Sequence, residues 1–267
     1  MNPIERGMLD ILKRGRDDFG VVAVKAEFEA EGTRPGEFLR LLELARRADL
    51  KVALKIGGCE AVSDLLASRV YGVDYIIAPM VETPYALTKF ADAVRRTHGD
   101  DTATEFLFNL ETQTTLENLA SMIPLVRGGL TGIVFGRVDF TLSRGMPRTA
   151  VDERPITDAV LAVARVCAAL DRELVVGGSV SVRSVDALRA FRQVRLDRFE
   201  TRKIIFDGAA CESDRIADGI ANAVEFELLW LQNKRDHYHG IAREDEARIA
   251  MMEQRAGAGS PRVKAAA

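Results

Sequence analysis

The chain is poor in the residues that build disulfide frameworks and zinc sites. Its 267 residues include only three cysteines and three histidines. The cysteines, Cys59, Cys167 and Cys211, show no paired spacing, and neither a CxxC nor an HExxH motif occurs. We therefore expect reduced thiols rather than disulfides, and no structural zinc site.

The chain also has no excess of basic residues and no long apolar run. Lys and Arg total 37 against 40 for Asp and Glu, which gives a net charge of −3. Nucleic-acid binding normally requires a basic excess, and a membrane span requires about 20 apolar residues. No signal-peptide pattern opens the sequence. These absences predict a cytoplasmic protein that binds neither nucleic acid nor membrane.

Short strand-like runs alternate with helical patterns over most of the chain. The strand-like runs are Val21–Glu27, Val52–Ile56, Tyr75–Ala78, Glu105–Leu110, Gly132–Phe135, Glu173–Val176 and Arg198–Phe206. The helical patterns are Glu37–Ala48, Glu60–Val70, Pro84–Arg96, Thr115–Ile123, Ile156–Leu170 and Val182–Ala190. This alternation indicates βαβ units and a parallel sheet.

Seven strands in a chain of this length favour an α/β fold closed as a TIM-type (β/α)8 barrel. A dinucleotide-binding open sheet is disfavoured, because no GxGxxG follows the first strand and no Walker motif occurs. The position of the eighth strand stays open: the N-terminal segment, a division of Arg198–Phe206, or no eighth strand at all.

The pattern changes after the last strand. We expect a barrel over residues 1–208 and a helical extension over residues 209–255, with helical patterns at Ala210–Gln232 and Glu244–Arg255. The extension is predicted to cover the barrel or to pair subunits, which suggests a homo-oligomer. Residues 256–267 are small, polar and basic, and are expected to be a disordered tail.

Charged residues gather at the predicted carboxyl ends of the strands, where the active sites of such barrels lie. They are Lys25, Glu27, Glu29, Lys55, Glu111, Arg137, Asp139, Glu200, Arg202 and Lys203. Charges inside a barrel mouth must pair or bind an ion. Glu111 and Asp139 follow adjacent strands, which run roughly 5 Å apart. Two carboxylates so placed predict a Mg²⁺ or Mn²⁺ site completed by water and substrate oxygens.

Three segments at these positions resemble the HpcH/HpaI aldolase and citrate lyase β-subunit family of the phosphoenolpyruvate/pyruvate barrel superfamily. They are Gly72–Thr83, Leu110–Leu119 and Gly132–Phe140, within a resemblance that covers about residues 20–206. The resemblance implies an eight-stranded barrel and makes Glu111 and Asp139 the metal ligands. It also implies that the backbone around Gly136–Asp139 holds a 2-oxoacid, with Lys55 near the position of a substrate-binding arginine.

The sequence departs from this family at one catalytic position. Where the aldolases carry an Asp-Gly-Glu-His run, this chain has Lys25-Ala26-Glu27-Phe28, so Phe28 replaces the acid–base histidine. Phenylalanine cannot transfer a proton. Proton transfer would then fall to Glu27, Glu29, Glu200 or a metal-bound water.

The first hypothesis is a divalent-metal-dependent aldolase or carbon–carbon lyase that acts on a pyruvate-type 2-oxoacid, or its aldol adduct, through a metal-stabilised enolate. Its expected catalytic residues are Lys55, Glu27 and Glu29, and its expected substrate-binding residues are Lys55, Gly136, Arg137, Glu200 and Arg202. The alternatives are an acyl-thioester lyase of the citrate lyase β type and a non-catalytic barrel subunit that retains the pocket. The missing histidine favours the non-catalytic barrel subunit. A Schiff base on Lys25 or Lys203 is disfavoured, because nearby carboxylates raise a lysine pKa.

Overall fold

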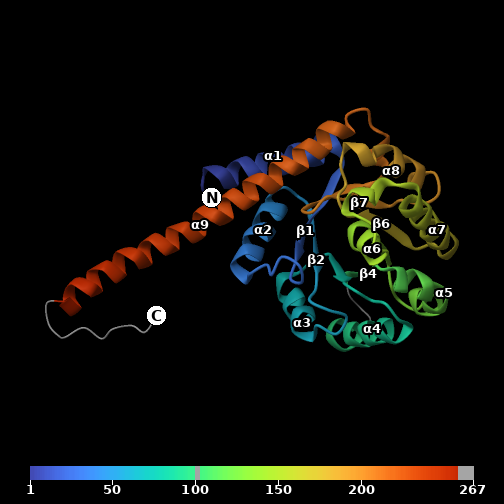
Figure 1. Ribbon diagram of the computed structural model, residues 1–267, viewed down its shortest axis with the longest axis horizontal. Helices are drawn as coiled ribbons and strands as arrows, with labels where there is room; N and C mark the ends of the chain where they lie inside the picture. The colour runs from blue at the N-terminus through green and yellow to red at the C-terminus, as the bar shows by residue number, and fades with distance from the viewer. Residues whose placement is uncertain (100–102, 258–267) are drawn as a thin grey trace.

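A computed structural model describes residues 1–99 and 103–257 of the chain. Its centre is a closed barrel in which the strands follow one another in chain order (Figure 1). The strands are β1 (Val21–Glu27), β2 (Lys51–Lys55), β3 (Tyr75–Ala78), β4 (Glu105–Leu110), β5 (Gly132–Gly136), β6 (Glu173–Gly177), β7 (Arg198–Glu200) and β8 (Ile204–Asp207). The predicted α/β barrel is therefore confirmed.

The eighth strand comes from the division of Arg198–Phe206, one of the three options that the sequence left open. Strands β1 to β7 pair in parallel, whereas β8 runs antiparallel to both β7 and β1. Only Thr201, Arg202 and Lys203 join β7 to β8. A link this short can form a hairpin but not a helical crossover, so β8 must reverse direction as it closes the barrel.

Helices surround the barrel (Figure 1). They are α1 (Pro3–Phe19), α2 (Pro35–Arg47), α3 (Val62–Tyr71), α4 (Pro84–His98), α5 (Gln113–Arg127), α6 (Arg137–Ser143), α7 (Arg154–Leu170), α8 (Val185–Arg192) and α9 (Ile216–Gly257). Short 3₁₀ turns lie at Arg148–Asp152, Val182–Ser184 and Gly208–Glu212. No helix in the described part of the chain is both long and apolar enough to cross a membrane.

Helix α1 was not predicted, although its start carries clear sequence signals. The Asn2 side chain accepts a hydrogen bond from the Glu5 N–H, and the Glu5 carboxylate accepts one from the Asn2 N–H. Pro3 occupies the first turn, where its missing N–H costs nothing. Gly20, with φ of 70°, ends the helix in the left-handed conformation and leads directly into β1.

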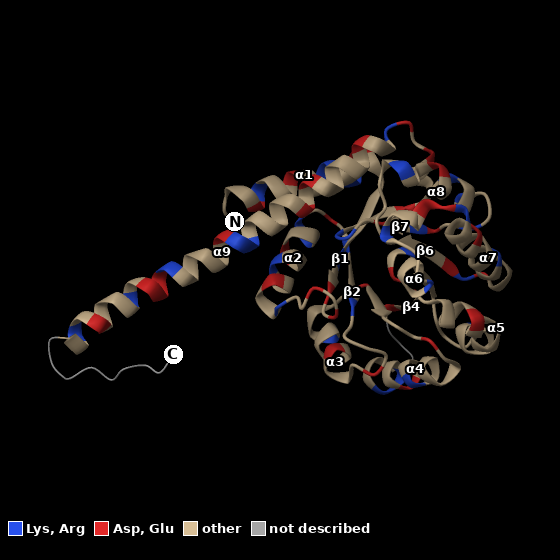
Figure 2. Ribbon diagram, viewed as in Figure 1, with Lys and Arg blue, Asp and Glu red and all other residues tan. Residues whose placement is uncertain are grey.

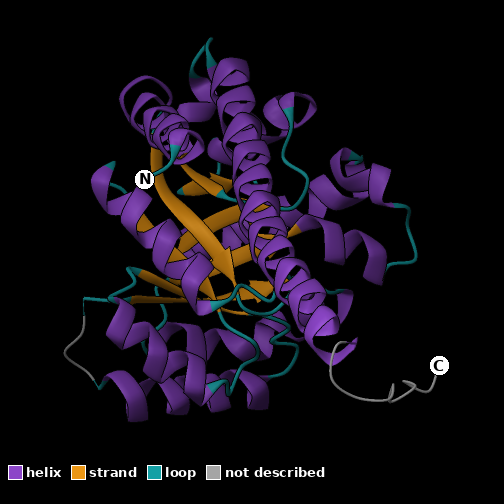
Figure 3. Cartoon of the chain, turned by 90° about the vertical axis from the view of Figure 1, so that its left-hand side faces the viewer, coloured by secondary structure: helices purple, strands orange, loops and turns teal. Residues whose placement is uncertain are grey.

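Helix α9 packs along α1 and then continues beyond the barrel (Figures 1 and 3). It is one helix of 42 residues that contains the predicted pattern Glu244–Arg255 and all of Ala210–Gln232 except the first six residues, since α9 begins at Ile216. Ala256 and Gly257, predicted as the start of a disordered tail, still belong to α9, and residues 258–267 of that tail lie outside the described residues. The division at residue 208 between barrel and extension stays a prediction.

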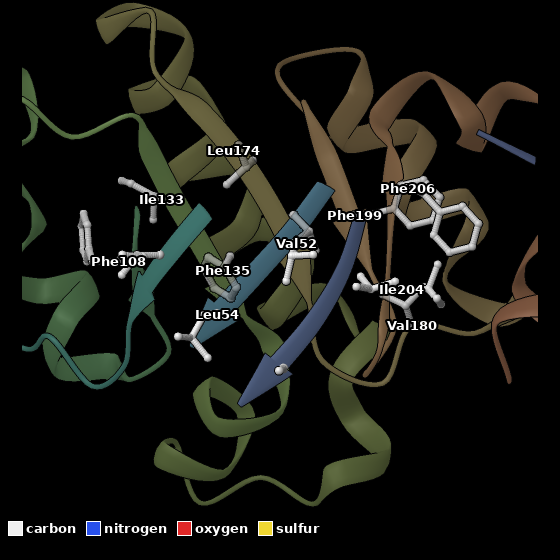
Figure 4. Packing of buried hydrophobic residues seen from close by; sticks show 14 of the residues in the cluster. Val52, Leu54, Phe108, Ile133, Phe135, Leu174, Val180, Phe199, Ile204 and Phe206 are labelled. Carbon is white, nitrogen blue, oxygen red and sulfur yellow. The ribbon is translucent and has the colours of Figure 1, made fainter. Parts of the chain in front are cut away.

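Alternation along the strands separates two apolar regions. Outward-facing side chains such as Leu54, Phe108 and Phe135 pack against the helices (Figure 4). Inward-facing side chains form a separate small cluster inside the barrel: Ala23, Ala53, Tyr75, Ile77, Leu107, Val134, Val175 and Ile205. Side chains two residues apart share a face of a strand. Lys25, Lys55 and Asn109 are each two residues beyond a member of this cluster, so they point inward above it.

Candidate active site

Two lysines and four glutamates form a charged cluster at the carboxyl ends of β1, β2, β4 and β7. We call this group the mouth cluster: Lys25, Glu27, Glu29, Lys55, Glu111 and Glu200. Charged positions of both signs lie on the strands within the ring of helices (Figure 2). All six residues were predicted from the sequence as candidates, and the structure brings them together in two linked groups.

Lys25 is the centre of the first group. Its ammonium lies 3.2 Å from Glu27 Oε1 and donates a hydrogen bond to Glu200 Oε1. Burial alone would lower the pKa of Lys25, but Glu200 and Glu27 outweigh it and raise that pKa. For Glu27, burial favours a higher pKa, yet Lys25 and Lys55 together bring it below its ordinary value. Both residues are therefore charged at neutral pH.

Lys55 is the centre of the second group. Its Nζ lies 3.2 Å from Glu29 Oε2 and 3.3 Å from Glu111 Oε2. Burial disfavours the ammonium, but Glu111 and Glu29 more than compensate and raise the pKa of Lys55. Lys55 therefore supplies a fixed positive charge at the mouth.

Glu111 is the most deeply buried carboxylate of the mouth cluster, with 1% of its surface exposed. Its Oε1 accepts a hydrogen bond of 2.9 Å from the Met80 N–H, and its Oε2 accepts one of 2.6 Å from Asn109 Nδ2. The N-cap of α5 is Thr112, whose Oγ1 accepts a hydrogen bond from the Thr115 N–H. The Glu111 carboxylate therefore does not cap the helix that follows it.

Asp139 lies elsewhere than the sequence indicated. It was predicted at the end of a strand, but β5 ends at Gly136 and Asp139 belongs to the first turn of α6. The residue is half-buried. Among the described residues, its carboxylate has no hydrogen bond or ion pair with the protein, so it is available to a ligand.

The same change of geometry turns Arg137 away from the mouth cluster. On a helix, residues two apart do not share a face, so Arg137 and Asp139 diverge. The buried guanidinium of Arg137 donates to Asp152 Oδ1 at 2.6 Å, to the Gly178 carbonyl at 2.9 Å and to the Gly177 carbonyl at 3.2 Å. Arg137 joins α6 to the segment after β6, and its side chain is occupied by these groups.

The charged side chains of the β7–β8 hairpin also point in different directions. Glu200 points inward to Lys25, whereas Arg202 is half-exposed and its Nε donates to Glu31 Oε1 at 2.9 Å. Lys203 also pairs with Glu31. Arg202 and Glu200 therefore do not pair with each other.

The chemistry of the site fits a hard divalent cation. Glu111 directly follows β4, Asp139 lies in the first turn of α6 just after the adjacent β5, and the buried Asn109 Oδ1 has no hydrogen-bond partner. Amide and carboxylate oxygens are ligands that Mg²⁺ and Mn²⁺ accept. No group of three or more His, Cys, Asp or Glu arranged to hold a metal occurs within residues 1–99 and 103–257. An ion here would therefore need water or substrate oxygens as well.

The position of the missing histidine is closed to acid–base chemistry. The Phe28 ring packs edge-on against Phe38 of α2, with ring centroids 5.5 Å apart, on the outer side of β1.

The carboxylates of the mouth cluster differ in exposure. Glu29 has the most exposed side chain, at 28%, against 10% for Glu27. Glu200 Oε2 is buried and has no hydrogen-bond partner.

Sequence reasoning did not assign three groups that shape this site. Asn109 was given no role, although its position two residues before Glu111, at the end of β4, places both side chains on one face. The Met80 N–H lies in the loop after β3 and contacts Glu111, whereas the Asp152 carboxylate lies in the 3₁₀ turn Arg148–Asp152 and holds Arg137. Only the fold brings those two into place.

Comparison with known proteins now identifies the class. The model of the HpcH/HpaI aldolase/citrate lyase family matches residues 47–193, more than half of the chain. The chain belongs to this family, as its sequence resemblance predicted, and the family's members are aldolases and lyases of carbon–carbon bonds. The matched span contains Lys55, Glu111 and Asp139 but not Lys25, Glu27, Glu29 or Glu200.

Solved structures agree on the fold. An HpcH/HpaI aldolase from Desulfitobacterium hafniense is similar with a TM-score of 0.56 and 13% identity, covering 80% of this chain and 88% of that one. A variant of the citrate synthase SbnG is similar with a TM-score of 0.53 and 15% identity, covering 93% and 90%. No curated protein matches the sequence significantly.

Proposed function

We propose that the protein is a divalent-metal-dependent carbon–carbon lyase or aldolase that acts on a pyruvate-type 2-oxoacid or its aldol adduct. The observation that carries the proposal is the state of the two predicted metal ligands. Glu111 is buried and held by Asn109 and Met80, while the carboxylate of Asp139 has no partner in the described part of the protein. Family membership supports the reaction class.

Glu111 and Asp139 would hold Mg²⁺ or Mn²⁺, which supplies a Lewis acid for the keto oxygen and the enolate that bond cleavage leaves. Lys55 places a permanent positive charge beside Glu111, where it attracts the anionic 2-oxoacid. As a point charge it binds a carboxylate without the paired hydrogen bonds of an arginine. Arg137 and Arg202, also expected to contact the substrate, are engaged by Asp152 and Glu31 and have no part in this proposal.

Glu29 is the group that we assign to proton transfer. Of the mouth cluster's carboxylates it is the most exposed, and its contact with Lys55 places it beside the proposed substrate site. Glu27 is the weaker candidate, because the lowered pKa of its carboxylate makes it a poor proton acceptor. Glu200 Oε2, buried and without a partner, is left to accept a hydrogen bond from a substrate hydroxyl group or from water.

Exchange of the pyruvate methyl protons for deuterium, followed by NMR, tests the proposal. We expect exchange with Mg²⁺ or Mn²⁺ that stops on addition of EDTA and in Glu111→Gln, and that slows in Glu29→Gln. Glu117→Gln, which changes an exposed carboxylate on α5, is the matched control and should exchange normally. Binding of Mn²⁺, measured by calorimetry, should weaken in Glu111→Gln but not in Glu117→Gln.

Two outcomes would reject the proposal. Exchange that persists in EDTA would show that the reaction does not depend on a metal. Absence of exchange with every 2-oxoacid tested would show that the protein does not form the enolate. Turnover that requires an acyl-thioester would instead support the citrate lyase type of reaction.

A further inference from the structure

Among the described residues, no packing contact explains why the outer part of α9 is helical. Its first turns are held by buried residues such as Ile220, Phe226 and Trp230, but all residues from 241 to 257 are exposed and helical. Figure 1 shows this part extending away from the barrel, and Figure 2 shows charges of both signs along it. In proteins, most of the stability of a helix comes from packing of its apolar face rather than from intrinsic helix propensity. A packing partner would stabilise it.

A largely exposed stripe runs along α9 from Val224 to Ala256 with alternating spacings of four and three residues, which is the spacing of a coiled-coil seam. The positions are Val224, Leu228, Leu231, Arg235, Tyr238, Ala242, Asp245, Ile249, Met252 and Ala256. Five of these are large apolar residues with about half of their surface exposed: Val224, Leu228, Leu231, Ile249 and Met252. The buried residues of α9 lie on a different face, so the stripe is free to pack.

The stripe is complementary to itself when read in the reverse direction. An antiparallel pair of identical helices centred at the level of Gly240 aligns positions whose numbers add up to 480. The aligned pairs are Val224 with Ala256, Leu228 with Met252, Leu231 with Ile249, Arg235 with Asp245, and Tyr238 with Ala242. Every apolar position meets an apolar one, and the single basic position meets the single acidic one.

We propose that α9 forms an antiparallel coiled coil with α9 of a second copy of this chain. Each aligned pair joins an a position to a d position of the heptad, which is the layer composition that an antiparallel pair produces. Tyr238 also donates a hydrogen bond of 2.6 Å to Glu37 Oε1 of α2, so its ring is held in place opposite the small Ala242. The helix, at about 1.5 Å per residue, is long enough for all ten layers.

Charge decides between the two possible directions. A parallel pair would place Arg235 against Arg235 and Asp245 against Asp245 in the seam, and like charges there oppose association. The antiparallel pair places each Arg235 against Asp245 of the second copy. Like charges meet at two places beside the antiparallel seam: Glu225 with Glu253 and Lys234 with Arg248. The repulsion is reduced at both, because Glu225 forms an ion pair with Arg14 and Lys234 forms one with Glu37.

Sedimentation of the full chain at several concentrations tests the association. We expect a dimer whose dissociation constant rises about a hundredfold or more in Ile249→Glu or Met252→Glu, because symmetry introduces each change into two layers. Met251→Glu is the matched control: Met251 adjoins Met252, is 43% exposed and lies off the stripe. It should dimerise as the unchanged protein does. A monomer, or equal effects of Met251→Glu and Met252→Glu, would overturn the proposal.

Charge exchange tests the direction. Asp245→Arg should weaken the dimer because it sets arginine against Arg235, and the double change Arg235→Asp with Asp245→Arg should restore it. Oxidation of an equimolar mixture of Leu231→Cys and Ile249→Cys chains should link one copy of each, since these two positions meet only in the antiparallel pair, and neither variant should cross-link by itself. Circular dichroism checks that each variant remains folded. Failure of the double charge exchange to restore dimers, together with no cross-link, would exclude this pairing.

Discussion

Gly136 lies so close to Glu111 that a β-carbon at residue 136 would stand 2.8 Å from Glu111 Cβ and 2.9 Å from its Oε2. Real β-carbons do not approach so closely, so the absence of a side chain at this position is what lets β5 lie against the Glu111 carboxylate. Gly136 was predicted to contact the substrate. Its observed neighbour is the proposed metal ligand.

Gly136→Ala should therefore impair the site more than the fold. The new methyl group would displace Glu111 from the Asn109 amide, and we expect Mn²⁺ binding and pyruvate proton exchange to fall about tenfold or more, because small misplacements of catalytic groups are costly. Gly58→Ala is the control, since a β-carbon there would meet nothing within 4 Å. Equal Mn²⁺ binding in the two variants would show that Glu111 tolerates the crowding.

Strand alternation was enough to predict much of the mouth cluster. Lys55 ends β2 and Glu111 directly follows β4, and the sequence marks both strands clearly, so the inward direction of these side chains could be inferred from the period of two. Asp139 and Arg137 could not be placed in this way, because β5 ends at Gly136 and a helix begins at once. An error of two or three residues at a strand end changes the face on which a side chain lies.

Contacts between distant segments were beyond the reach of the sequence. Lys25 and Glu200 are 175 positions apart and meet only because the barrel closes through the β7–β8 hairpin. Alternation within one strand predicts which way each side chain points, but it does not predict which opposite charge it will meet. The position of β8 was open for the same reason, since a hairpin strand of four residues has too little pattern to separate it from β7.

Phe28→His should not restore the family's acid–base group. The Phe28 side chain packs outward against Phe38 and α2, so an imidazole there would be separated from the mouth cluster by the strand itself. We expect a loss of about 1–2 kcal/mol in the free energy of unfolding from the broken aromatic contact. Proton exchange should not increase. A rate that rises with a new ionisation near pH 6.5 would contradict this placement.

Lys25→Met should destabilise the protein by about 3–5 kcal/mol at pH 7, because Glu27 and Glu200 would be left as buried charges without their partner. Urea unfolding measures the loss. The corresponding change in an exposed lysine, Lys13→Met, is the control and should have little effect.

The pH dependence of that variant follows from the sign of the shift in Glu27. In the unchanged protein the pKa of Glu27 is lowered, so its contribution to stability is present above pH 4.5 and is lost as the pH falls through the folded pKa. Without Lys25, burial raises this pKa instead, so the folded state takes up a proton more readily than the unfolded one. Lys25→Met should therefore become more stable between pH 7 and pH 5, whereas the unchanged protein gains nothing from Glu27 over that range. Parallel unfolding curves at the two pH values would contradict the assignment.

Neither Lys25 nor Lys203, both buried near the mouth, should form a Schiff base with a 2-oxoacid. The raised pKa of Lys25 keeps it protonated between Glu27 and Glu200, and a protonated amine is not a nucleophile. Burial lowers the pKa of Lys203, but its ammonium is paired with Glu31. Treatment with pyruvate and sodium borohydride, followed by intact-mass measurement, should leave the mass of the protein unchanged, while an aldolase known to use a lysine gains an adduct under the same conditions. An adduct that maps to Lys25 or Lys203, and that disappears when that lysine is changed to methionine, would replace the metal-stabilised enolate with covalent catalysis.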